Sequence, residues 1–209
     1  MSLQIHVHHL STPATTLVRG LHLQIAPGTV HTLMGPSGSG KSSLLAAVCG
    51  TLPEGLRFDG EVQLEGTRID TLPTQARRVG ILFQEDLLFA HMTVGENLLF
   101  AVPAGPRAAR DAQVAQALAD VEMTGTTHAN PATLSGGQRT RIALARALLA
   151  QPHALLLDEP FSKLDAALKD RMRALVFGLV KARNIPALLV THDVGDVADA
   201  AHLTQLASS

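Results

Sequence analysis

The 209-residue sequence contains no Trp or Tyr, only 6 Phe and a single cysteine, Cys49. So few aromatic rings leave little surface for stacking on nucleobases. A net charge of -1 also gives no bulk attraction for a polyanion. The composition therefore predicts no nucleic-acid partner. One cysteine cannot form an internal disulfide, and we expect Cys49 to be a small core residue.

The sequence also lacks the long apolar runs of a membrane protein. No run approaches the roughly 18 to 20 residues that a membrane helix needs. The first residues, MSLQIHVHH, lack the basic start and apolar stretch of a secretory signal. We therefore expect a cytoplasmic protein that reaches a membrane only through a partner. Hydrophobic residues make up 46% of the chain, which is enough for a real core.

Strand patterns occur at both ends of the chain and helical patterns in its middle. Residues 154–157 and 187–190 read as buried strands that flank a helix at 166–183, a rhythm typical of parallel strands. The other segments are strands at 3–7, 21–25, 29–34 and 79–83, a hairpin at 58–70, and helices at 111–121 and 139–149. We predict one α/β domain, with a core made of 1–86 and 151–209 and an inserted helical subdomain at 87–150.

A glycine-rich loop follows the buried strand 29–34 and opens a helix. Its sequence GPSGSGKS matches the phosphate-loop pattern GxxxxGK[ST] in the expected strand–helix context. The backbone N–H groups of such a loop converge on phosphate, Lys41 reaches the β and γ phosphates, and the Ser42 hydroxyl ligates Mg2+. The predicted binding residues are Gly35, Pro36, Ser37, Gly38, Ser39, Gly40, Lys41, Ser42 and Ser43.

Two carboxylates end the apolar strand 154–157, and Pro160 follows them. Ligands of open α/β sheets bind at the carboxyl ends of the strands, so we expect Asp158 beside the phosphate loop. Adjacent residues of an extended chain point in opposite directions, which predicts different roles. Asp158 is a candidate for the Mg2+ shell, and Glu159 for the base that polarises the attacking water.

Single polar residues end two further buried strands. Gln84 follows strand 79–83 and His192 follows strand 187–190. Each alone is compatible with an ordinary strand end. If they converge on the same sheet edge, Gln84 can meet a Mg2+-bound or attacking water, and His192 can donate to the γ-phosphate.

A second anion-binding helix end lies within the helical block. In the segment Leu134 to Gln138, Ser135 is a natural N-cap and the glycines permit close backbone approach. The candidate contacts are Ser135, Gly136, Gly137 and Gln138. From the residues alone, the chain has either two phosphate sites or one site shared between two chains.

The order and spacing of these motifs resemble the ATP-binding cassette (ABC) ATPases over essentially the whole chain. The resemblance is carried by GPSGSGKS, Gln84, LSGGQ, ALLLDEP, SKLD and His192. It implies a P-loop NTPase core with a parallel central sheet, an N-terminal antiparallel β part and a helical subdomain. It also implies ATP and Mg2+, with the active form a head-to-tail homodimer. Ser135 and Gly137 would then contact the γ-phosphate held by the other chain, Asp165 would lie at the dimer seam, and Glu159 and His192 would be the base and the switch.

Residues 87–97, which follow Gln84, resemble importer-type cassettes, similar to the small thiamine, sulfate and polyamine import ATPases. The resemblance implies integral membrane permease subunits and a solute-binding protein as partners. The alternative is a soluble ABC ATPase, but those usually have tandem cassettes or long coiled coils, and neither is found here. A P-loop kinase is a third reading, against which LSGGQ and Glu159 argue.

The sequence departs from the family pattern in several places. Residues 8–18 lack the aromatic that usually stacks on adenine, so we expect weakened base discrimination, unless His9 substitutes for it. Lys163 stands where alanine is common. The chain has 17 residues after His192, so we expect the family's last strands to be missing.

Two groups of side chains have plain interpretations. His6 and His8 share a strand face, but no third ligand is evident, so no metal site is predicted there. The arginines of the second helix, Arg139, Arg141 and Arg146, are interpreted as a solvated face or as domain contacts.

Overall fold

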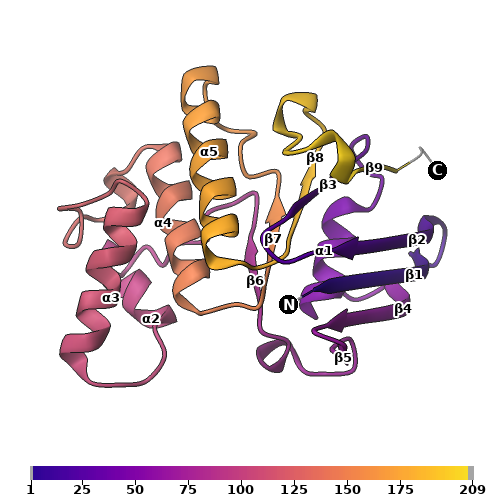
Figure 1. Cartoon of the computed structure of the whole chain (residues 1–209), viewed down its shortest axis with the longest axis horizontal. Helices are drawn as coiled ribbons and strands as arrows, with labels where there is room; N and C mark the ends of the chain where they lie inside the picture. Colours follow the sequence, from indigo (N-terminus) through magenta and orange to yellow (C-terminus); the bar gives the residue numbers. More distant parts are fainter. Residues whose placement is uncertain (1, 207–209) are drawn as a thin grey trace. The chain divides into compact units, whose positions relative to one another are not determined.

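The computed structural model describes residues 2–206 of the chain, which divide into two compact units (Figure 1). The first unit contains the described residues up to Ile81, His153–Glu159, and those from Val176 onward; the second contains Leu82–Pro152 and Pro160–Leu175. Residues 160–175, which were predicted in the core, thus belong to the helical unit. Helix α5 (Ala166–Arg183) begins in the second unit and ends in the first.

The first unit holds a four-stranded antiparallel sheet in the order β2-β1-β4-β5. Its strands are β1 (Leu3–Ser11), β2 (Thr16–Ile25), β4 (Arg57–Leu64) and β5 (Thr67–Arg68). The predicted alternation holds along the start of β1, where Leu3, Ile5 and Val7 are fully buried and His6 is exposed. One face of the sheet therefore packs on the core and the other faces solvent.

A second sheet has the order β6-β7-β8-β3-β9. Its strands are β3 (Val30–Met34), β6 (Val79–Leu82), β7 (Ala154–Asp158), β8 (Ala187–Thr191) and β9 (Leu203–Gln205). β7 and β8 are buried along their whole length, as expected for parallel strands covered on both faces. The expectation that strands after His192 are missing is too strong, because β9 pairs in parallel with β3.

The register of this sheet aligns the carboxyl ends of three strands. Met34 of β3 pairs with Thr191 of β8, and Asp158 of β7 pairs with Val190 of β8. The residues that follow the three strands, among them Gly35, Glu159 and His192, therefore leave the sheet at one edge. This is the edge at which α/β sheets bind ligands.

Helix α1 (Lys41–Cys49) joins the two sheets into one core. Leu44, Leu45 and Val48 of α1 belong to the same buried cluster as residues of β1 and of the parallel sheet. Cys49 is buried in this cluster, and burial raises the pKa of its thiol. The expectation that it is a core residue is confirmed.

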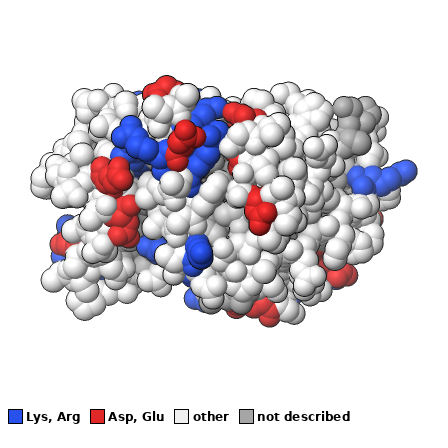
Figure 2. All heavy atoms as spheres, turned by 45° about the horizontal axis from the view of Figure 1, so that its top comes forward, with Lys and Arg blue, Asp and Glu red and all other residues white. Residues whose placement is uncertain are grey.

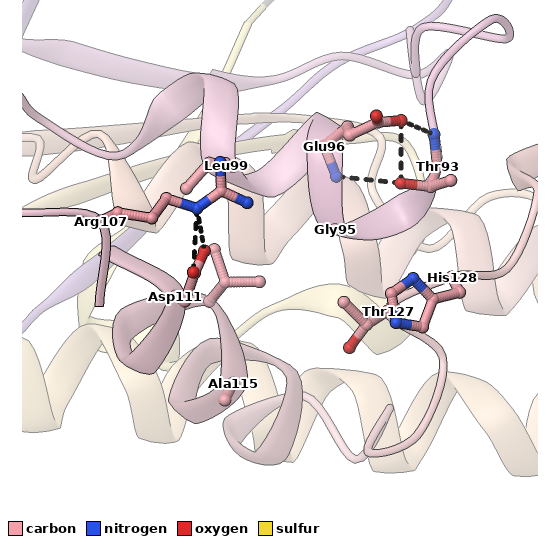
Figure 3. A pocket seen from close by; sticks show the side chains of 10 residues that line it. Thr93, Gly95, Glu96, Leu99, Arg107, Asp111, Ala115, Thr127 and His128 are labelled. Atoms are coloured by element: carbon pink, nitrogen blue, oxygen red, sulfur yellow. Dashed lines mark hydrogen bonds and ion pairs between the residues drawn. The ribbon is translucent and has the colours of Figure 1, made fainter. Parts of the chain in front are cut away.

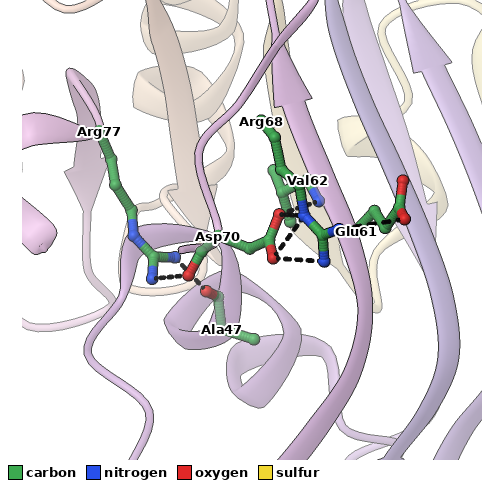
Figure 4. Close-up of polar contacts among 6 residues, drawn as sticks. All are labelled: Ala47, Glu61, Val62, Arg68, Asp70 and Arg77. Carbon is green, nitrogen blue, oxygen red and sulfur yellow. Dashed lines mark hydrogen bonds and ion pairs between the residues drawn. The ribbon is translucent and has the colours of Figure 1, made fainter. Parts of the chain in front are cut away.

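A buried arginine closes the carboxyl end of α1 (Figure 4). Arg77 donates to the carbonyls of Ala47 and Val48 at 2.8 and 2.9 Å, and to those of Asp70 and Leu72 at 2.8 and 2.9 Å. The last carbonyls of a helix have no partner within it and carry partial negative charge. Arg77 thus supplies what the helix end lacks and ties it to the segment that follows β5.

The second unit is helical. It contains α2 (Val94–Ala101), α3 (Arg107–Asp120), α4 (Gly136–Leu149) and the start of α5. Val94 and Leu98 of α2, Leu118 of α3 and Ile142 of α4 belong to its own buried cluster. Short 3-10 turns complete the chain at η1 (Thr74–Ala76), η2 (Pro131–Thr133), η3 (Val194–Asp196) and η4 (Ala200–His202).

Among residues 2–206, no helix combines the length and apolar character that crossing a bilayer requires.

Replacement of Arg77 tests its role at the end of α1. Arg77→Met keeps much of the apolar stem but leaves buried carbonyls without donors, so we expect a loss of about 2–4 kcal/mol in the free energy of unfolding. Urea denaturation measures it. Arg78→Met, at the exposed neighbouring position, is the control, and equal stability of the two variants would show that the Arg77 hydrogen bonds contribute little.

Candidate functional site

The loop between β3 and α1 is shaped by glycine. Gly38 and Gly40 have φ values of 82° and 86°, a left-handed conformation that side chains rarely adopt. Lys41 is buried, and its Nζ donates to the carbonyls of Gly35 and Pro36 at 2.7 and 2.9 Å. The Lys41 side chain thus folds back over the loop, at the position where a bound phosphate would lie.

The loop fits a phosphate chain on two observations. The N-terminal amides of α1 open into it, where the helix carries partial positive charge. In addition, Ser39 Oγ is a buried polar atom with no hydrogen-bond partner in the described structure. Buried hydroxyls are normally paired, so an orphan in this position is suited to a ligand oxygen. Ser43 lies one residue past Ser42 in the first turn of α1.

Asp158 meets the loop from the end of β7. The Ser42 hydroxyl donates to Asp158 Oδ1 at 3.0 Å. Burial, and to a lesser degree the neighbouring Glu159, raises the pKa of the Asp158 carboxyl against the opposing effects of Ser42 and Lys41. A buried carboxylate beside a hydroxyl is an oxygen donor set of the kind that Mg2+ accepts, and a cation there would offset the cost of burial.

Glu159 and His192 face each other at the same sheet edge. His192 Nδ1 lies 3.0 Å from Glu159 Oε1, and the Glu159 amide donates to the Val190 carbonyl at 3.0 Å. Glu159 has a φ of 44°, an uncommon conformation for a residue with a side chain. Such conformations cost about 1–3 kcal/mol and cluster at active sites. A hollow of about 250 Å3 lies next to His192, lined also by Gly35, Pro36 and Leu206.

The structure thus brings together the predicted residues of the first unit, namely the phosphate loop, Asp158, Glu159 and His192. Gln84 and residues 135–138 belong to the second unit. Ser135 is the N-cap of α4: its Oγ accepts from the Gln138 amide, and Gln138 Oε1 accepts from the Ser135 amide. A Cβ on Gly137 would meet the end of the Leu168 side chain, so Gly137 packs closely against the start of α5. Asp165 Oδ1 accepts from the Leu168 amide at the start of α5.

Sequence reasoning missed the residues that hold the segment after Gln84. Asn97 is fully buried and donates to the carbonyls of Phe89, Met92 and Thr93 while accepting from the Phe89 amide. An asparagine with apolar neighbours in an otherwise helical pattern was the available signal. Its hydrogen bonds fix the turn that precedes α2.

The arginines of α4 make contacts within the second unit rather than forming a solvated face. Arg139 pairs with Asp86 at 3.3 Å, and Arg146 donates to the carbonyls of Asp86 and Leu87. Arg141 pairs with Glu122 at 3.4 Å. Domain contacts are therefore the correct interpretation of these three side chains.

A pocket of about 430 Å3 lies wholly in the second unit, between α2, α3 and the turn at Thr127 and His128 (Figure 3). Its charged groups are engaged locally: Arg107 pairs with Asp111 at 2.9 Å, and Glu96 accepts from Thr93. None of its lining residues belongs to the unit that holds the phosphate loop. On the face drawn in Figure 2, basic and acidic side chains lie intermixed among uncharged ones.

Comparison with known proteins identifies the class. The model of the family described as ABC transporter matches residues 18–162. The chain is 51% identical over 189 residues to YnjD, an uncharacterized ABC transporter ATP-binding protein of Escherichia coli (strain K12), covering 90% of this chain and 87% of that one. The chain therefore belongs to the ABC transporter family, as an ATPase cassette.

Other relatives carry more specific names. Over 181 residues the chain is 40% identical to an aliphatic sulfonates import ATP-binding protein, SsuB 2 of Burkholderia cenocepacia (strain HI2424), covering 87% of this chain but 64% of that one. It is 42% identical to a sulfate/thiosulfate import ATP-binding protein, CysA of Thermosynechococcus vestitus, covering 84% of this chain and 52% of that one. The chain spans about half to two thirds of these two relatives.

The fold is also that of solved cassettes. The dimeric structure of MJ0796, a bacterial ABC transporter cassette by its description, superposes with a TM-score of 0.81 at 27% identity, covering 98% of this chain and 94% of that chain. The same cassette in a dimeric post-hydrolysis state bound to ADP and Pi gives a TM-score of 0.80. The predicted family and fold class are confirmed.

The burial of Asp158 generates a prediction about stability. Its pKa is raised in the folded state, so the folded protein binds the proton more readily, and wild-type stability falls as pH rises through that raised pKa. Asp158→Asn removes the buried charge. In protein free of nucleotide and Mg2+, we expect a higher Tm for the variant, by a margin that shrinks from neutral toward acidic pH.

Thermal unfolding across pH measures this margin, with Asp59→Asn as the control because Asp59 is exposed on β4. If the Tm of Asp158→Asn does not exceed that of the wild type, or exceeds it equally at every pH, burial does not raise the pKa of Asp158 as described.

Proposed function

We propose that this chain is the ATP-binding and ATP-hydrolysing subunit of an ABC importer, working on the cytoplasmic face of a membrane through separate permease subunits. The observation that carries the enzymatic part is the single sheet edge at which the phosphate loop, Asp158, Glu159 and His192 meet. Relatives named as import ATP-binding proteins favour transport over a soluble non-transport ATPase, and the match to the ABC transporter family disfavours a small-molecule kinase.

Each residue of the edge has a role in this proposal. The backbone N–H groups of residues 35–43, except Pro36, and the Lys41 side chain hold the β and γ phosphates. Glu159 polarises the attacking water, and His192, 3.0 Å from it, orients the carboxylate and donates to the γ-phosphate. Mg2+ would be held by Ser42 and Asp158, with Gln84 as a further ligand, and when bound it neutralises charge on the phosphates.

We further propose that the complete site needs two chains. The N-terminus of α4 offers a second set of amides, capped by Ser135, in a unit that does not contain the phosphate loop. In a head-to-tail homodimer, Ser135, Gly136, Gly137 and Gln138 of one chain would close over ATP held by the other. The dimeric arrangement described for MJ0796 supports this proposal. Hydrolysis would release the dimer.

Glu159→Gln tests the base. The amide keeps the size of the side chain but cannot take a proton, so we expect ATP binding to persist while turnover falls at least about 100-fold. The variant should also accumulate as an ATP-dependent dimer, measured by light scattering with and without ATP.

Glu54→Gln serves as the control, because Glu54 is exposed outside the site. Rapid ATP turnover by Glu159→Gln would show that Glu159 is not the catalytic base. Slow turnover without any dimer would leave the base in place but reject the shared site.

The proposed membrane partner has a candidate docking surface in the second unit. We define it by Leu87, Phe89 and Phe100; Arg146 lies over the Phe89 ring and donates to the Leu87 carbonyl. Phe100 is 68% exposed and Leu87 is 51% exposed, and the rings of Phe89 and Phe100 meet edge to face at 5.2 Å. Large exposed apolar side chains gathered in this way mark an interaction surface. The segment is held rigid by Asn97 and Arg146, which suits a short helix of a permease subunit.

Phe100→Ser tests the docking surface. Because Phe100 is largely exposed, the variant should keep the wild-type Tm, but association with permease subunits coexpressed from the neighbouring genes should fall at least about tenfold. Co-purification from detergent measures this. Val194→Ser is the matched control, since Val194 is 74% exposed in η3 of the first unit. If both variants lose permease association equally, the surface around Phe100 is not the specific docking site.

A solute-binding protein is the remaining partner that we propose, in keeping with import. Transported solute would be selected by these other chains.

A further inference from the structure

Three histidines lie together on the exposed face of the antiparallel sheet, apart from the residues of the phosphate site. His6 and His8 are exposed on β1, and His22 is exposed on β2 in direct register with His6. The sequence predicted no metal site at His6 and His8 because no third ligand was evident. The pairing of β1 with β2 supplies that third imidazole.

The distance of the His6 ring from each of the other two rings matches shared coordination of one ion. The ring centroid of His6 lies 4.6 Å from that of His8 and 5.3 Å from that of His22. With metal–nitrogen bonds of about 2.0–2.1 Å, two imidazoles on one tetrahedral ion have ring centroids about 5 Å apart. The observed distances therefore lie on either side of the value that coordination requires.

The local backbone makes room for this cluster. His8 is the extra residue of a β-bulge on β1, because Val7 pairs with Gly60 and His9 pairs with the adjacent Asp59. Bulges redirect side chains. On β2, Gly20 lies between the partners of Val7 and His9, and it has no side chain to fill the space opposite His8.

A carboxylate lies on the other side of His6. Glu61 of β4 pairs in register with His6, and Arg68 Nη1 holds its Oε1 at 3.3 Å (Figure 4). A carboxylate beside a metal-binding histidine commonly accepts the N–H of the second ring nitrogen. His9 is occupied differently, since its Nδ1 accepts from Arg19 Nε at 3.5 Å.

We propose that His6, His8 and His22 bind one transition-metal ion of the class that prefers imidazole, such as Zn2+, and that this ion cross-links β1 to β2. As their side chains are placed, no group of three His, Cys, Asp or Glu among residues 2–206 could hold a metal ion. Binding therefore requires the exposed rings to turn about their side-chain torsions, with water completing the coordination. The proposal does not depend on the ATPase chemistry.

The test is calorimetric titration of Zn2+ into the untagged full chain without nucleotide. We expect about one ion per chain, and at least about tenfold weaker binding after His6→Gln, His8→Gln or His22→Gln. A second readout is Tm, because an ion that binds only the folded sheet stabilises it. Zn2+ should raise the Tm of the wild type and leave that of the His6→Gln/His22→Gln double variant nearly unchanged.

Two controls locate the site. His128→Gln removes an exposed imidazole of the second unit, and His192→Gln removes the one beside Glu159; both should bind Zn2+ within about twofold of wild type. Absence of Zn2+ binding, full binding by His22→Gln, or loss of binding only in His192→Gln would overturn the proposal.

Discussion

The hydrogen bond from Ser42 to Asp158 is the contact on which the arrangement of the site depends. It joins the first turn of α1 to the end of β7, two elements far apart in the sequence. The register of β7, β8 and β3 places the strand ends at one level, and this bond then fixes the phosphate loop against them. Through β8 the same register positions His192 against Glu159.

Several energetically unfavourable features of the first unit lie at this edge. A buried lysine (Lys41), a buried carboxyl with raised pKa (Asp158), an unpaired hydroxyl (Ser39) and a left-handed glutamate (Glu159) belong to the phosphate loop, to the start of α1 and to the end of β7. Each costs free energy in the isolated fold. The shared core of α1 and both sheets, together with the cap that Arg77 provides, supplies the stability that tolerates them. Such a distribution is expected where a protein holds charged groups ready for a ligand.

The sequence predicted most of the core and its chemistry because both have local signatures. The phosphate loop is one continuous stretch of sequence. The apolar runs before Asp158 and His192 are followed by polar residues, which mark where each strand ends. Features that depend on register were not predictable. The opposition of His6 and His22, the bulge at His8 and the long reach of Arg77 to α1 arise only when strands and loops pair across the fold. The membership of residues 160–175 in the helical unit is likewise set by packing rather than by composition.

The discontinuity of the first unit also bears on how the protein is made. Its two buried strands β7 and β8 come from segments that the ribosome adds only after the whole of α2, α3 and α4. Ser42 and Asp158 are separated by 116 positions. The phosphate loop is therefore synthesised long before the carboxylate that its serine contacts. Domains generally fold as units during synthesis. Here the helical insert can acquire most of its core first, and the parallel sheet, with its long-range pairings, is the late and slow step of biogenesis.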